Sequence, residues 1–160
     1  MKTERLTVFI ETQNRMGILS KILNIFLEEQ VILSEVYTSE LPFDTGKLIT
    51  VEVLVNKINA EKILKYIKDI EGVINVNMTH ENEIIYRRII LFQFITDAYL
   101  EQSALQQIIE ENNVQIIDIN KEFIIMSKSG SEIEIDKFIK ELQPYNFNQF
   151  VMSGKASIRN

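Results

Sequence analysis

The residues that could do chemistry in this sequence lie in a polar turn between an alternating apolar segment and an amphipathic helix. Residues 6–11 alternate as a β-strand does, and Gly17 precedes a helical pattern that begins at Ile18. A helix that opens at a glycine leaves backbone N–H groups unpaired, and a ligand can approach them closely because glycine has no Cβ. The partial positive charge of the helix N-terminus favours a carboxylate there. The turn therefore predicts a small-molecule sensor site rather than a catalytic centre.

The sequence contains none of the common catalytic patterns. It has no Walker A, GxSxG, HExxH or Rossmann glycine pattern, and it has no cysteine. The only histidine, His80, has no cysteine or second histidine nearby, and we interpret it as a solvated linker residue. We therefore expect a protein that is not an enzyme and that binds no metal or cofactor itself.

Composition and charge exclude further classes of protein. The chain has 160 residues, 46% of them hydrophobic, which suits one globular domain or two small ones. The net charge is −6, with 9 basic and 11 acidic groups in residues 1–80 and 8 and 12 in residues 81–160, which argues against nucleic-acid binding. No uncharged apolar run approaches the roughly 18 residues of a membrane helix, and no apolar signal region precedes the first strand. We expect a cytoplasmic protein without a membrane or nucleic-acid partner.

The apolar pattern of the chain occurs twice. In the first half it predicts strands near 5–11, 31–40, 47–55 and 73–78, a helix near 18–29, a hairpin turn at 42–46, and a second helix that is N-capped by Asn59 and ends at 71–72. In the second half it predicts strands near 84–95, 114–119, 123–127 and 147–152, a helix near 99–112, and a helix that opens with a capping box at 131–134 and stops at Pro144. The tail, residues 153–160, is mostly polar.

Both halves have the order βαββαβ, which is typical of ferredoxin-like α+β sandwiches. We predict two tandem ferredoxin-like domains, residues 1–79 and residues 83–160, with helices on one face of each sheet. Apolar runs such as residues 89–92 have no polar side, so the other face also carries apolar side chains. We expect a second copy of the chain or a partner protein to cover that face.

Several segments resemble a known family. The strand 6–11, the helix opening Gly17-Ile18-Leu19-Ser20 and Phe26 resemble an ACT domain. Residues 86–91, 114–119 and 149–158 are similar to segments of the small regulatory subunit of acetolactate synthase (acetohydroxyacid synthase), and the whole resemblance covers residues 5–158 in the family's order.

This resemblance implies a non-catalytic regulatory subunit in the biosynthesis of valine, leucine and isoleucine. Such a subunit binds and activates the large catalytic subunit, which is expected to use thiamine diphosphate, Mg and FAD. Many members also pass on feedback inhibition by an amino acid, usually valine, bound between the ACT domains of a homodimer. Carried over by position, the effector site includes Asn14, Arg15, Met16, Gly17, Ile18, Ile32 and Leu33.

The sequence departs from the family pattern in this site. Residues 30–33 read Gln-Val-Ile-Leu where the family usually has Gly-aromatic-Asn-Ile, and the loop before Gly17 is longer. An Asn side chain can accept a hydrogen bond from a ligand ammonium group, whereas Ile32 cannot. We hypothesise that partner binding and activation are retained, while valine control is weak, absent or shifted to another ligand.

Two other functions are compatible with this fold. A free-standing tandem-ACT amino-acid sensor would bind a metabolite without a catalytic subunit, and it should open a second helix at a glycine. The chain has Thr96-Asp97-Ala98-Tyr99 at that place, which favours the partner-binding role. A purely structural dimerisation module would leave the Gly17 loop without a ligand.

Overall fold

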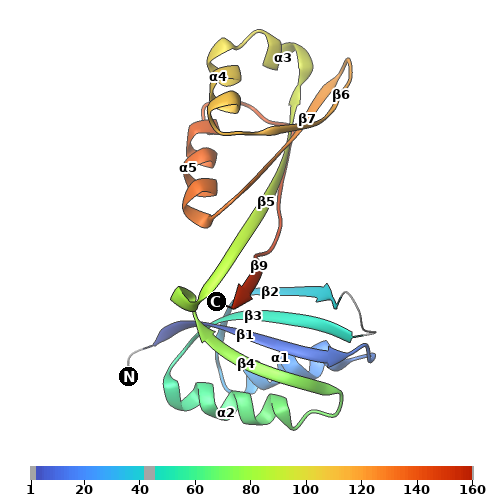
Figure 1. Cartoon of the computed structure of the whole chain (residues 1–160), viewed down its shortest axis with the longest axis vertical. Coiled ribbons are helices and arrows are strands. Elements are labelled where there is room, and N and C mark those ends of the chain that lie inside the picture. The colour runs from blue at the N-terminus through green and yellow to red at the C-terminus, as the bar shows by residue number, and fades with distance from the viewer. Residues whose placement is uncertain (1–2, 42–45, 160) are drawn as a thin grey trace. The chain divides into compact units, whose positions relative to one another are not determined.

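The computed structural model describes residues 3–41 and 46–159 and divides the chain into two compact units. The second unit comprises Tyr86–Ile158, and the first comprises the residues before it together with the end of the chain. In each unit an antiparallel sheet carries helices on one face (Figure 1). Residues 42–45 of the predicted hairpin turn lie outside the described residues.

The first unit contains four strands and two helices. In chain order these are β1 (Glu4–Gln13), α1 (Ile18–Glu28), β2 (Ile32–Glu40), β3 (Gly46–Val55), α2 (Lys57–Lys68) and β4 (Val73–His80). The strands lie in the order β2-β3-β1-β4. The helix-facing residues of the sheet pack against the apolar stripes of both helices and form a core that includes Val8, Ile10, Ile22, Phe26, Val51, Val53, Ile63 and Ile67.

Two local predictions for the first unit were wrong. Helix α2 begins before the predicted position, because Asn56 is its N-cap and the Asn56 side chain accepts a hydrogen bond from the Asn59 backbone N–H at 3.0 Å. His80 is the last residue of β4, opposite Leu6 of β1, and is not in a linker. Its ring is exposed, as predicted.

The second unit has the same strand order as the first. After the 3₁₀ helix η1 (Glu81–Glu83) come β5 (Ile84–Ile95), α3 (Thr96–Leu100), α4 (Ser103–Glu111), β6 (Gln115–Ile119), β7 (Phe123–Gly130), α5 (Glu132–Leu142), β8 (Gln149–Met152) and β9 (Ala156–Arg159). The order β6-β7-β5-β8 corresponds strand by strand to the first sheet, and β9 pairs with β5. The prediction of two tandem ferredoxin-like α+β units is confirmed.

The helices of the second unit differ in one respect from the prediction. The capping box is present, since the Ser131 side chain and the Glu134 carboxylate each accept a hydrogen bond from the other residue's backbone N–H. The predicted helix 99–112 is two helices instead, separated at Glu101 and Gln102. The Gln106 side chain donates to the carbonyls of Tyr99 and Leu100 at the end of α3, and the Gln102 backbone N–H also donates to the Tyr99 carbonyl at 3.3 Å.

The polar tail contributes a buried cation to the second unit. Lys155 is only 5% exposed, and its Nζ lies 3.5 Å from Glu132 Oε2 and 4.7 Å from the centroid of the Tyr86 ring. The Tyr86 hydroxyl donates to Glu132 at 3.1 Å. The ion pair, the cation–π contact and the hydrogen bond join the tail, β5 and α5 in one polar cluster.

This cluster predicts an acid-sensitive contribution to stability. Burial acts to raise the pKa of Glu132, but the Lys155 charge, the Tyr86 hydrogen bond and the Arg88 charge together lower it. A carboxyl whose pKa is lower in the folded state stabilises the fold above its unfolded pKa, and the contribution is lost as pH falls through the folded value. We expect the difference in unfolding free energy between wild type and Glu132→Gln to be largest near pH 7 and to shrink below about pH 4.5. Urea denaturation over a pH series measures this, and a difference that does not change with pH would contradict it.

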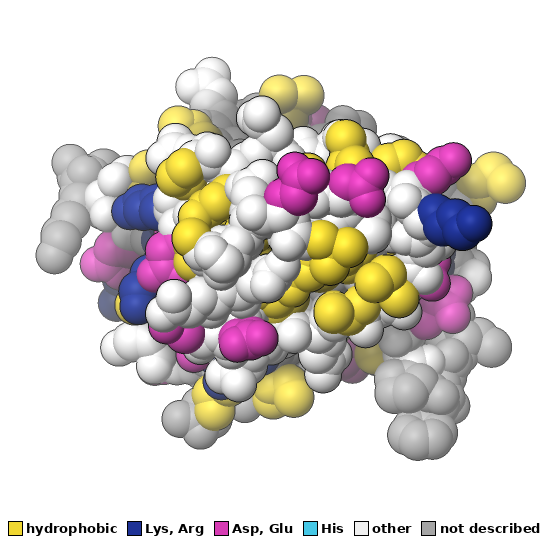
Figure 2. All heavy atoms as spheres, turned by 90° about the horizontal axis from the view of Figure 1, so that it is seen from above, with side chains coloured by type: hydrophobic (Ala, Val, Ile, Leu, Met, Phe, Trp, Pro, Cys, Tyr) yellow, Lys and Arg dark blue, Asp and Glu magenta, His cyan; other side chains and the backbone are white. Residues whose placement is uncertain are grey.

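The second sheet carries apolar side chains on both faces. Ile90 and Phe92 are buried beneath the helices, whereas Ile89 and Leu91 on the opposite face are 50% and 45% exposed. Figure 2 shows acidic side chains among apolar ones on one face of the molecule, with few basic side chains.

None of the helices that the structure describes is both long enough and apolar enough to cross a membrane.

Candidate functional site

The turn between β1 and α1 has the geometry that its sequence predicts. Gly17 is the N-cap of α1 and has φ 78°, a left-handed conformation that glycine adopts without strain. No side chain caps α1, and the first turn contains no acidic residue. A Cβ built on Gly17 would meet no atom within 4 Å, so the space beside this helix end is open. An anion can therefore reach the first-turn amides of α1.

Arg15 holds the turn in place from one side. Its Nη1 lies 2.7 Å from Glu71 Oε1, and the hydrogen bond and charge of Arg15 lower the pKa of that carboxyl. The Gln13 backbone N–H also donates to the carbonyl of Gly72 at 2.8 Å. These two contacts attach the β1–α1 turn to the α2–β4 turn. The Arg15 guanidinium is thus already engaged with a carboxylate of this chain.

The other predicted residues of the turn differ in how exposed their side chains are. Asn14 is exposed, and the Met16 side chain is fully exposed, so both are accessible to a ligand or a second chain. Ile18 is only 6% exposed, and its side chain packs in the core. Only its backbone N–H, and not its side chain, therefore faces the turn. The Ile18 N–H donates weakly to the Arg15 carbonyl at 3.4 Å.

Ile32 and Leu33 lie far from the turn within one chain. They begin β2, where Ile32 pairs with Leu54, whereas the turn follows Gln13, which pairs with Gly46 at the other end of β3. Helix α1, with 11 residues and a length of about 16 Å, separates the two sets. Ile32 is 67% exposed on an edge strand, and Leu33 packs against the core. One chain therefore does not assemble all seven predicted residues into one pocket.

The corresponding position of the second unit has no such turn. Strand β5 runs directly into α3, whose N-cap Ile95 has an extended backbone. The Thr96 backbone N–H donates to Glu122 O at 3.0 Å, and its hydroxyl donates to Asn120 O at 2.8 Å. The β6–β7 turn thus satisfies the first backbone N–H of α3, which is not left available to a ligand. Among the residues that the structure describes, no group of three or more acidic or imidazole side chains is placed to hold a metal ion.

Comparison with known proteins finds similarity to one group of regulatory subunits. A family model described as the small subunit of acetolactate synthase matches residues 87–160. The acetolactate synthase small subunit of Mycolicibacterium smegmatis is 21% identical over 159 residues, covering 98% of this chain and 90% of that protein. The corresponding protein of Aquifex aeolicus is 18% identical over 152 residues, covering 95% and 79%. This chain is therefore similar over nearly its whole length to acetolactate synthase small subunits, and its residues 87–160 match their family model.

A solved acetolactate synthase small subunit has a similar fold. The crystal structure of the acetolactate synthase small subunit from Thermotoga maritima superimposes with a TM-score of 0.84 at 18% identity, covering 98% of both chains. The two ferredoxin-like units described above therefore have the fold of that solved structure. The effector role of the Gly17 turn and Ile32 stays a prediction.

Proposed function

We propose that this chain is the regulatory subunit of acetolactate synthase, which binds the catalytic subunit and raises its activity in the biosynthesis of valine, leucine and isoleucine. The match of residues 87–160 to the small-subunit family is the observation that carries this proposal. In this role the chain is non-catalytic and acts in the cytoplasm. Thiamine diphosphate, Mg and FAD are then cofactors of the catalytic partner.

The positions of the effector residues favour a homodimer through the first unit. Strand β2 is an edge strand, and its end at Glu40 lies at the same end of the sheet as Gln13. If two β2 edges pair antiparallel about a twofold axis, Ile32 of one copy approaches the Gly17 turn of the other. A dimer would thus bring together the two sets of residues that one chain keeps apart, and an amino acid could bind between them.

The free-standing sensor is the second candidate. It would need only the open Gly17 turn, which the first unit supplies. The second unit offers no equivalent turn, because Thr96 and the β6–β7 turn satisfy the start of α3. This difference between the units favours a partner-binding role for the second unit.

The deciding experiment is a titration of this chain into a fixed amount of the cognate catalytic subunit, with acetolactate formation as the readout. We expect the rate to rise and then saturate, because binding sites on the catalytic subunit become filled. An unrelated acidic protein at equal concentration is the control for non-specific stabilisation. If the rate does not change while the chain alone binds an amino acid, the free-standing sensor is correct. If neither effect is seen, the chain is a structural module.

A further inference from the structure

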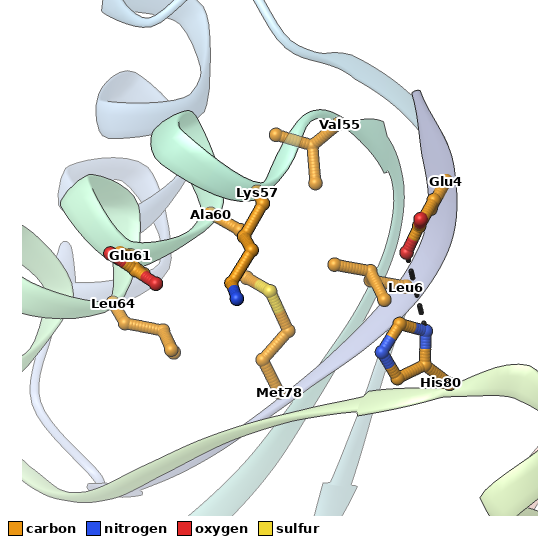
Figure 3. A pocket seen from close by; sticks show the side chains of 9 residues that line it. All are labelled: Glu4, Leu6, Val55, Lys57, Ala60, Glu61, Leu64, Met78 and His80. Carbon is orange, nitrogen blue, oxygen red and sulfur yellow. Dashed lines mark ion pairs between the residues drawn. The ribbon is translucent and has the colours of Figure 1, made fainter. Parts of the chain in front are cut away.

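The first unit contains a pocket away from the Gly17 turn. It has a volume of about 550 Å³ and lies where the first two turns of α2 face the ends of β1, β3 and β4 (Figure 3). This volume is within the range of about 300–1,000 Å³ that is usual for small-molecule sites. Its lining combines core residues of the first unit with charged residues at the rim.

The inner part of the pocket is apolar. Leu6, Val55 and Ala60 are buried at 7%, 2% and 5% exposure and belong to the core of the first unit. Leu64 and Met78 are half-buried and pack against the same core. An aliphatic side chain entering here would exchange water contacts for contacts with these residues, which favours binding.

The rim of the pocket carries charges of both signs. Figure 3 shows the Lys57 ammonium near the middle of the pocket, with Glu61 on one side and the Glu4–His80 pair on the other. Glu4 Oε2 lies 3.6 Å from His80 Nδ1. Within the described part of the chain, by contrast, neither Lys57 nor Glu61 has an ion-pair partner. Two opposite charges at one pocket are therefore available to a ligand.

The spacing of Lys57 and Glu61 suits a ligand that carries a carboxylate and an ammonium group close together. Lys57 and Glu61 are four residues apart on α2, so their Cβ atoms lie about 5–6 Å apart on one face of the helix. With Lys on the N-terminal side of Glu, this order is the less favourable one for a direct pair along a helix. The carboxylate and ammonium groups of an α-amino acid are separated by only one carbon, so Lys57 and Glu61 can bind both at once.

We propose that this pocket binds an aliphatic α-amino acid, with the ligand carboxylate on Lys57, its ammonium group on Glu61 and its side chain on Leu6, Leu64 and Met78. The Gly17 turn lies beyond the opposite end of β1, about nine residues or 30 Å along the strand direction from this pocket. The site is therefore separate from the effector site proposed above and does not depend on a dimer or on a catalytic partner.

The test measures binding of L-leucine to the full chain by calorimetry and by NMR of the Met78 methyl group. Two analogues separate the contributions of the charges: isoamylamine lacks the carboxylate of leucine, and 4-methylpentanoate lacks its ammonium group. We expect leucine to bind, each analogue to bind at least tenfold more weakly, and Lys57→Met and Glu61→Gln each to weaken leucine binding at least tenfold. Lys65→Met, an exposed change on the same helix outside the pocket, is the matched control and should leave the affinity unchanged.

Any one of three results overturns the proposal. Leucine does not bind at millimolar concentration, or Lys57→Met binds leucine as tightly as wild type does. The third result is that Asn14→Ala abolishes leucine binding while Lys57→Met leaves it unaffected. The last result would place the amino acid at the Gly17 turn instead. Activation of the catalytic subunit is measured separately, so the failure of this proposal and the failure of the regulatory function can be told apart.

Discussion

Replacing Phe138 by alanine is expected to lower the free energy of unfolding of the second unit by about 3–5 kcal/mol. The Phe138 side chain is fully buried, and its ring centroid lies 5.5 Å from that of Phe92. Lys128 Nζ also lies 5.5 Å from the Phe138 ring centroid. The substitution therefore removes an aromatic contact, a cation–π contact and a large apolar volume from the centre of a small core. Urea denaturation followed by circular dichroism measures the loss.

Ile133→Ala is the matched control for this prediction. Ile133 lies on the same helix, α5, but is 82% exposed, so its truncation should change the unfolding free energy by less than about 0.5 kcal/mol. A loss below about 1 kcal/mol for Phe138→Ala would mean that α5 is not packed on the second sheet as described.

The second large effect is expected at the start of β2. In the proposed complex with the catalytic subunit, replacing Ile32 by Asn should lower the valine concentration for half-inhibition by at least about tenfold, equivalent to about 1.4 kcal/mol. The Asn carbonyl can accept a hydrogen bond from the ligand ammonium group, and such bonds to charged groups contribute about 1.5–3 kcal/mol. Because Ile32 is 67% exposed in the single chain, the substitution should not unfold the first unit.

Ile32→Ala tests whether Ile32→Asn acts by adding a hydrogen-bond acceptor or only by removing the bulk of the isoleucine side chain. It removes the same bulk without providing a hydrogen-bond acceptor, so it should leave valine inhibition as weak as in the wild type. If Ile32→Ala and Ile32→Asn increase inhibition equally, steric exclusion by Ile32 explains the weak control. Strong inhibition of the wild-type complex by micromolar valine would refute the hypothesis itself.

Most of the fold could be predicted because its signals are local. Strand β5 matches its predicted bounds, and α1 and β3 differ from theirs by one residue. Alternating apolar residues and helical stripes depend only on neighbouring positions, and so does the Ser131 capping box. The α2 N-cap was misplaced because two asparagines, Asn56 and Asn59, stand three residues apart and either could cap a helix.

The break between α3 and α4 had no local signal. Residues 99–112 contain neither glycine nor proline, and their apolar spacing suits one continuous helix. The break is compatible with the fold because Gln106 supplies donors to the carbonyls of Tyr99 and Leu100. Lys155 is similar in this respect, because a lysine in a polar tail is normally solvated, and the contacts that favour its burial include Glu132 and Tyr86, which are distant in sequence.

Local sequence pattern is enough to predict the two βαββαβ units, the glycine that opens α1, and the lack of a hydrogen-bond acceptor at Ile32. Three-dimensional packing places Ile32 at the opposite end of the sheet from Gly17 and brings Lys57 and Glu61 into a pocket with Leu6 and Met78. Periodicity along the chain specifies only which face of an element a residue occupies. Which residues of different elements meet depends on strand order and register, and these follow from packing across the whole sheet.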